Sequence, residues 1–172
     1  MKRILILLLL SMGMRHNAMA QQTEIYNSEK AHLSLTYPST FHTVPIDNAP
    51  HMLIHLQNNK NEEYAISYWD YGIDKSIDIW NPVFYQKVEQ NAKKIPDLQL
   101  ISCSKTIINL KSRKVKAAEM IHTKNLGQKK KYFITYQTLW RGNLIQILYI
   151  SEDSFVLEST KGRALLKNIQ LQ

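Results

Sequence analysis

Apolar and polar side chains alternate along much of this chain. The alternation covers residues 31–37, just before Pro38, and it returns in residues 52–56 and 64–69, on either side of the polar stretch 57–63. A period of two is typical of a strand with one buried face, and proline is disfavoured inside a sheet. We therefore predict a strand over residues 31–37, followed by a hairpin with a polar tip.

The period changes to that of a helix after the hairpin. The apolar residues there are spaced by three or four positions, which places them on one helical face: Trp80, Phe84, Val88, Ala92 and Ile95. Asn81 followed by Pro82 is typical of an N-cap and a first helical position, and Pro96 is expected to end the helix. The sequence thus predicts one helix between the hairpin and the strands that follow.

The second half of the chain is predicted to be a meander closed by a helix. Four β-branched, apolar runs are separated by turns that contain Lys, Gly and Asn: residues 98–110, 115–123, 132–139 and 144–150. Helical spacing returns over residues 154–167, with Asp153 or Ser154 placed as the N-cap. Two hairpins, a crossover helix, a meander and a C-terminal helix define an α+β fold, in which both helices pack on a mostly antiparallel sheet.

One short segment resembles a known family. Residues 33–39, Leu-Ser-Leu-Thr-Tyr-Pro-Ser, are followed by the aromatic Phe41, and this string is similar to the opening strand of the PsbP-like superfamily. The predicted order of elements agrees with that family over residues 30–170. The resemblance implies the fold of the extrinsic photosystem subunits and of DcrB-like periplasmic proteins, and a role in binding without catalysis. Phe41 stands where the family commonly has tryptophan, and the string contains no catalytic or metal-binding residue.

The start of the chain has the organisation of an export signal. Lys2 and Arg3 precede an unbroken apolar run over residues 4–10, and Ala18 and Ala20 place small side chains where a signal peptidase cleaves. A membrane anchor is disfavoured because polar residues interrupt the apolar run before it is long enough to cross a bilayer. We predict that residues 1–20 are a cleavable signal peptide.

The remaining residues, 21–172, are predicted to form one PsbP-like α+β domain in the periplasm or outside the cell. Gln21 stands where a lipoprotein would carry cysteine. No later segment is long and apolar enough to span a bilayer. The predicted mature protein therefore has no transmembrane segment.

Basic residues exceed acidic ones. The formal net charge is +8, and loss of the signal peptide removes three basic residues and leaves +5. Much of the excess lies in two clusters, residues 111–116 and residue 124 with 129–131. Either cluster is a solvated hairpin end or a contact for an anionic partner, and nucleic acid is not expected in an exported compartment. The candidate binding residues of the first cluster are Arg113, Lys114 and Lys116.

The sequence carries no recognisable catalytic motif. No nucleophile elbow, zinc-protease motif, phosphate-binding glycine loop or dinucleotide fingerprint occurs in it. His51 and His55 have the spacing of helical metal ligands, but they lie in a predicted strand, where four residues span about 13 Å. We therefore expect no metal and no cofactor. Cys103 is expected in the core, and the alternative is a small secreted hydrolase or metal-dependent enzyme that uses Cys103 and His122.

Seven aromatic residues crowd into residues 64–85. Alternation sends Tyr64 and Tyr68 to the buried face of their strand and leaves Trp69 and Tyr71 off it. A partly exposed Trp-Tyr pair is a suitable anchor for a partner. We therefore predict an exported, non-catalytic binding or accessory protein that acts on a protein or cell-envelope partner; an immunity-type inhibitor of a secreted toxin also fits the sequence.

Overall fold

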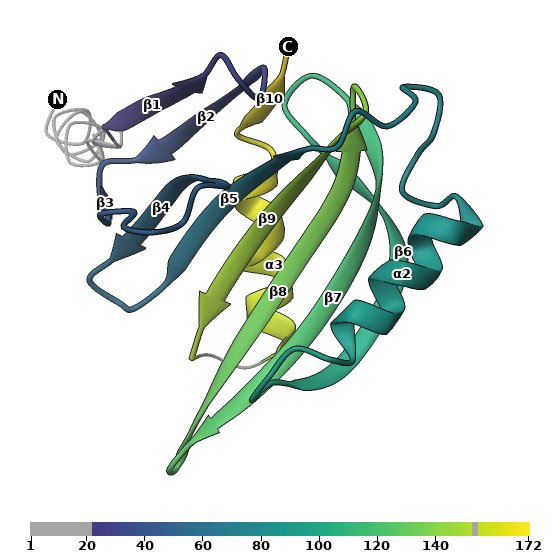
Figure 1. Cartoon of the computed structure of the whole chain (residues 1–172). Helices are drawn as coiled ribbons and strands as arrows, with labels where there is room; N and C mark the ends of the chain where they lie inside the picture. Colours follow the sequence, from purple (N-terminus) through teal and green to yellow (C-terminus); the bar gives the residue numbers. More distant parts are fainter. Residues whose placement is uncertain (1–21, 153–154) are drawn as a thin grey trace, which may run out of the picture.

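The computed structural model describes residues 22–152 and 155–172, and the predicted signal peptide and the predicted cap residues Asp153 and Ser154 lie outside them. Figure 1 labels the elements, whose bounds are β1 (Thr23–Ser28), β2 (Leu33–Pro38), β3 (Phe41–Thr43), β4 (Met52–Asn58), β5 (Glu63–Asp70), α2 (Pro82–Ala92), β6 (Gln99–Asn109), β7 (Lys114–Leu126), β8 (Lys129–Trp140), β9 (Asn143–Ser151), α3 (Phe155–Leu166) and β10 (Ile169–Leu171). The described elements confirm the α+β class.

The larger sheet has seven strands in the order β3-β4-β5-β9-β8-β7-β6, and every neighbouring pair is antiparallel. Helix α2 carries the chain from β5 to the far edge, and the meander β6 to β9 then returns to pair with β5 (Figure 1). The predicted hairpin, crossover helix and meander are confirmed.

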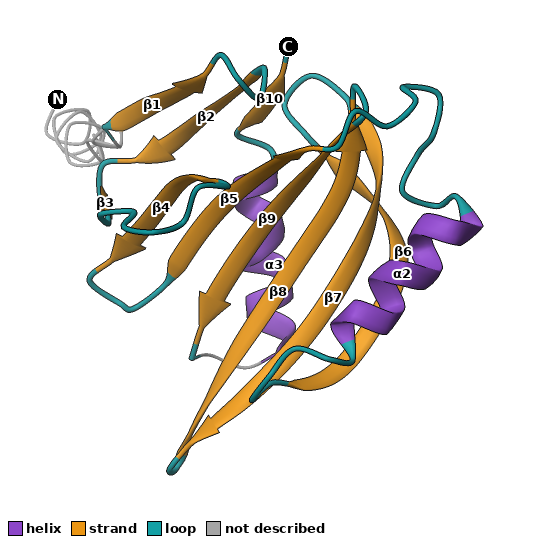
Figure 2. Cartoon of the chain, viewed as in Figure 1, coloured by secondary structure: helices purple, strands orange, loops and turns teal. Residues whose placement is uncertain are grey.

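The two faces of this sheet bear different cores. On one face, α3 and the smaller sheet cover a large cluster that includes Ile66, Ile134 and Leu165. On the other face, α2 covers a smaller cluster that includes Val88 and Met120. Figure 2 shows the two helices on opposite sides of the sheet. Alternation along the strands supplies both cores, because successive side chains point to opposite faces.

Local signals set the start of α2. The Asn81 side chain accepts a hydrogen bond from the Val83 amide, and Pro82 is the first helical residue, as predicted. Such a cap satisfies one of the amides that have no partner within the helix. The helix ends at Ala92, before the predicted stop at Pro96. Ile95 thus follows the helix instead of extending its apolar face.

Two features of the fold differ from the sequence-based expectation. A second sheet of three strands, in the order β1-β2-β10, accompanies the large one. The β7–β8 hairpin is also longer than expected, because β7 runs to Leu126 and β8 begins at Lys129, with Gly127 at φ 64° in the turn. Lys124 therefore pairs with Lys131 inside the ladder, where we expected a turn. Both strand ends are polar, and so they lack the alternation that marks a half-buried strand.

No helix among residues 22–152 and 155–172 has the length and apolar character needed to cross a membrane.

Candidate binding groove beside helix α2

A hollow of about 540 Å³ lies between α2 and the open part of the sheet. Phe84 and Val88 of α2 form one wall, and Leu139 of β8 and Leu144 of β9 line the floor. Trp69, at the end of β5, lines it together with Tyr71, which follows that strand. The hollow thus joins a helix face to three adjacent strands, and most of the side chains that line it are apolar or aromatic.

A second hollow of about 230 Å³ continues the first along α2. The two share Val88, Asn91, Gln137 and Gln146, so they form one groove, which we call the α2 groove. On its floor, the Gln137 Nε2 donates to Gln146 Oε1 at 2.8 Å. The groove is therefore apolar at both ends and carries carboxamides at its middle.

The strand geometry of β5 places Trp69 at the groove. Tyr64, Ile66 and Tyr68 face the α3 side, as predicted, and Trp69 faces the other side. The Trp69 ring stacks on the His51 ring with centroids 5.4 Å apart, which holds the indole in place.

Tyr71 lies at the exposed rim of the groove. Its side chain is 59% exposed, although it lines the hollow. The turn that contains Tyr71 is fixed because the Gly72 amide donates to the Asp70 carboxylate and Gly72 adopts φ 58°, a conformation that glycine tolerates. Tyr71 therefore offers an aromatic surface to solvent beside a partly covered tryptophan.

The loop that forms the end of the groove is pinned at several points. The Ile73 amide donates to the Gly142 carbonyl oxygen at 3.0 Å, and the Trp80 indole Nε1 donates to the Ala117 carbonyl oxygen at 2.8 Å. Ile79 is 1% exposed and belongs to the α2-side core. These contacts hold the loop against the sheet.

Lys116 belongs to this loop anchor. Its Nζ lies 2.6 Å from a carboxylate oxygen of Asp78 and 5.2 Å from the centroid of the Trp80 ring. The hydrogen bond from Lys116 is the main reason why the pKa of Asp78 lies below its usual value, and it outweighs the opposing effect of burial. Lys116 thus has a structural contact that sequence reasoning did not foresee.

The other two predicted basic residues lie away from the groove. The Arg113 guanidinium lies over the Trp140 ring at 4.3 Å, and Trp140 packs against the α3-side core. Lys114 is exposed and pairs with Asn109 at the start of β7. The structure therefore brings Trp69 and Tyr71 together at one site and places Arg113 on the opposite face of the sheet.

Several groove residues were not singled out from the sequence. Lys87 and Asn91 lie on α2, whereas Gln137 and Gln146 lie on adjacent strands. In the sequence, each of these residues has the pattern of an ordinary solvent-facing polar residue of its helix or strand. The strand pair Gln137 and Gln146 becomes recognisable only when the register of β8 with β9 is known.

Cys103 and His122, the two residues of the enzymatic alternative, both lie on the α2 side of the sheet. Cys103 pairs with Met120 in the ladder and packs against the α2-side core; burial is the main reason why the pKa of its thiol is raised. His122 is 0% exposed, and its Nε2 lies 2.8 Å from the Ala92 carbonyl oxygen. Among the described residues, no group of three His, Cys, Asp or Glu side chains is placed to hold a metal ion.

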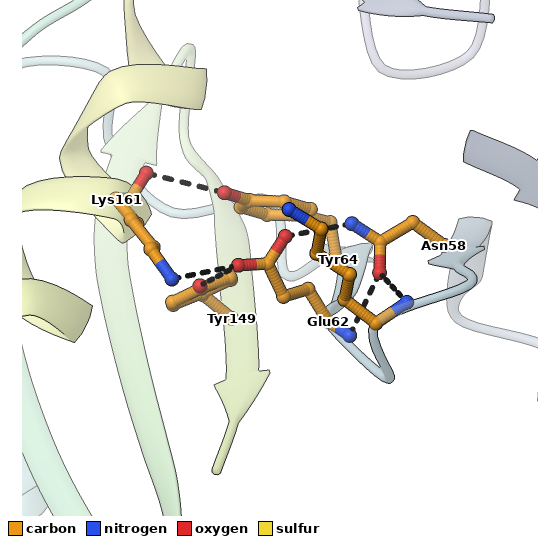
Figure 3. Close-up of polar contacts among 6 residues, drawn as sticks. Asn58, Glu62, Tyr64, Tyr149 and Lys161 are labelled. Atoms are coloured by element: carbon orange, nitrogen blue, oxygen red, sulfur yellow. Dashed lines mark hydrogen bonds and ion pairs between the residues drawn. The ribbon is translucent and has the colours of Figure 1, made fainter. Parts of the chain in front are cut away.

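A separate polar cluster joins the β4–β5 turn to α3 (Figure 3). Glu62 accepts from Lys161 Nζ at 3.0 Å, from Asn58 Nδ2 at 2.6 Å and from the Tyr149 hydroxyl at 3.4 Å, and the Tyr64 hydroxyl donates to the Lys161 carbonyl oxygen. Burial alone would raise the pKa of Glu62, but the hydrogen bonds and the Lys161 charge together hold it below its usual value. These partners occupy the carboxylate and fix the position of α3, which points to a structural role.

Solved structures show which fold this is. The chain is similar to cyanobacterial PsbP (CyanoP) from Synechocystis, with a TM-score of 0.60 and 15% identity over 94% of this chain and 99% of that one. It is also similar to LpqN of Mycobacterium tuberculosis, described as involved in cell envelope biogenesis, with a TM-score of 0.53 and 13% identity over 85% of this chain and 87% of that one. A protein of Bacteroides thetaiotaomicron gives a TM-score of 0.53 at 12% identity over 88% of this chain, which spans 49% of that protein.

These similarities confirm the PsbP-like fold that residues 33–39 and Phe41 predicted. At the identities found they define the fold and not a shared activity. No protein-family model matches the sequence, and no curated protein matches it.

Proposed function

We propose that this chain is an exported, non-catalytic binding or accessory protein that acts on a protein or cell-envelope partner through the α2 groove. The observation that carries the proposal is the rim of the groove, where Tyr71 is 59% exposed beside the half-buried Trp69 and above an apolar floor. Concave apolar sites with aromatic anchors are typical of binding surfaces.

Two further observations support a partner in the cell envelope. LpqN, which has a similar fold, is described as involved in cell envelope biogenesis. Residues 1–20 have the pattern of an export signal, which would deliver residues 21–172 to the periplasm or the medium. The enzymatic alternative has less support, because Cys103 packs against the α2-side core and the His122 ring contacts the Ala92 carbonyl oxygen at the end of α2.

The basic turn is a second contact in this proposal. Arg113 and Lys114 are exposed at the β6–β7 turn, and Lys116 lies near them, beside Asp78. A partner that reaches around this edge of the sheet would place an anionic region against Arg113 while its apolar part occupies the groove on the other face. This contribution should weaken as salt is added, because exposed charges are screened over about 8 Å at physiological ionic strength.

Site-specific cross-linking in the producing cells tests the proposal. A photoreactive phenylalanine at position 71 should give discrete adducts, whereas the same residue in place of Ile25, which is 67% exposed on β1, should give none. Trp69→Ala should remove the adducts, and Arg113→Glu should reduce them. Adducts that are the same at both positions, or their absence at position 71, would contradict the proposal. N-terminal sequencing of the exported protein should begin at Gln21.

A further inference from the structure

We propose that the α2 groove binds an extended peptide segment with large apolar side chains and an acidic residue, a proposal that rests on the function given above. The partner segment would run along α2, over the floor formed by β8 and β9. Three features of the groove carry this inference: its length, its carboxamides and its charge.

The length of the groove suits a short peptide. Both hollows follow α2, which has 11 residues and is therefore about 16 Å long at 1.5 Å per residue. An extended chain advances about 3.3 Å per residue, so roughly five residues span this length. Apolar side chains would enter the two ends, where Phe84 and Leu144 line the first hollow and Phe133 and Leu148 line the second.

The carboxamides at the middle of the groove match a peptide group. The hydrogen bond from Gln137 Nε2 to Gln146 Oε1 uses one donor of the first side chain and one acceptor site of the second. Gln137 Oε1 is left as an acceptor and Gln146 Nε2 as a donor, and Asn91 offers one of each. A peptide group also carries one donor and one acceptor. A hydrocarbon chain has neither, and it would cover these three side chains without replacing their bonds to water.

The charge of the groove favours an acidic segment. Among the described residues that line the two hollows, Lys87 is the only Lys or Arg, and no Asp or Glu is present. An Asp or Glu in the peptide would form an ion pair with Lys87, which lies on the exposed side of α2. A basic residue there would meet a like charge, which lowers affinity and gives selectivity.

Selection from a phage library that displays every five-residue sequence tests this inference. Panning on the wild-type protein, after depletion on Trp69→Ala, should enrich sequences that contain aromatic or branched apolar residues and at least one Asp or Glu. The affinity of the most enriched peptide, made synthetically, is then measured by calorimetry. Its binding site is mapped by the amide shifts of Gln137 and Gln146 in NMR spectra.

Two variants separate the roles of charge and carboxamide. Lys87→Glu should weaken the acidic peptide about tenfold and should strengthen the same peptide with its acid replaced by lysine. Lys75→Glu, at an exposed position outside both hollows, is the matched control and should change affinity less than twofold. Gln146→Leu should weaken the peptide at least fivefold while the circular dichroism spectrum stays unchanged.

Dodecanoate is the rival probe, because it is apolar and anionic but has no peptide group. If dodecanoate shifts the groove signals while no acidic, apolar peptide is enriched, the inference is overturned and the groove remains a binding site. If cross-linking at position 71 also fails, the proposed function falls with it. Equal binding of the acidic and lysine-bearing peptides would likewise overturn the inference.

Discussion

Replacing Glu62 with glutamine tests how α3 is held to the sheet. Glu62 Oε1 accepts one charge-assisted hydrogen bond from Lys161 Nζ at 3.0 Å, and Glu62 Oε2 accepts a hydrogen bond from Asn58 Nδ2 at 2.6 Å. A hydrogen bond to a charged group contributes about 1.5–3 kcal/mol. Glutamine keeps one oxygen that still accepts, and the Lys161 side chain is 40% exposed, so solvent screens part of the charge. We expect Glu62→Gln to lower the free energy of unfolding by about 1–2 kcal/mol at pH 7.

The effect should depend on pH in a defined direction. The pKa of Glu62 in the folded protein lies below its ordinary value of 4.5, so the folded state binds fewer protons than the unfolded state. The stabilisation is therefore complete above the unfolded pKa and is lost as the pH falls through the folded pKa. The difference between the wild type and Glu62→Gln should be full at pH 7 and should shrink steadily below about pH 4.5.

Urea denaturation of both proteins at a series of pH values measures this difference. Glu152→Gln is the matched control, because Glu152 also pairs with a lysine, Lys129, whose side chain is 69% exposed. An exposed pair contributes little, so the control should change stability much less than Glu62→Gln does. The reasoning is refuted if the two variants cost the same at pH 7, or if the loss in Glu62→Gln does not diminish in acid.

Three further predictions concern the remaining fold. Gly142→Ala should lower the free energy of unfolding in urea by about 2–4 kcal/mol, because at φ 82° the new Cβ would collide with the Ile73 carbonyl oxygen, whereas Gly127→Ala, with nothing within 4 Å, should lower it by about 1 kcal/mol; equal costs would contradict this. Arg163→Met should cost about 2 kcal/mol, because the buried Glu119 carboxylate loses the guanidinium that donates to it at 2.8 Å, and Glu119→Gln should restore part of the loss. Cys103 should react with Ellman's reagent at pH 8 more than tenfold slower than free cysteine, because burial raises the pKa of its thiol; a rate equal to that of free cysteine would contradict this.

The sequence predicted the strands of the large sheet because their two faces are covered to different extents, which leaves alternation in the sequence. Alternation in residues 64–69 assigned Tyr64 and Tyr68 to the core and left Trp69 on the other face, where the groove lies. Asn81 and Pro82 marked the start of α2 through capping chemistry, which acts between residues close in sequence. Signals of this kind are local, and so they can be read without knowledge of the fold.

The small sheet was not predicted because its signals are weak and distant. Strand β1 is mostly exposed and shows no regular alternation, and β10 has three residues. Strand β2 joins them by pairing with Ile169–Leu171, more than a hundred residues along the chain. The groove was missed in part for the same reason, because its walls come from α2, β5, β8 and β9 and no single segment shows a hollow.

The difference between the two faces of the large sheet explains why the groove lies beside α2. The α3 face is closed by a helix and a second sheet, whereas α2 packs over β6 and β7 and leaves the adjoining β8 and β9 partly uncovered (Figure 1). The loop before α2 is pinned through Ile73 and Trp80, which fixes one end of the groove against the sheet. A preformed site loses less conformational entropy on binding than a mobile one, which raises affinity for a given contact area. A stable sheet with one incompletely covered face therefore combines a rigid scaffold with a surface open to a partner.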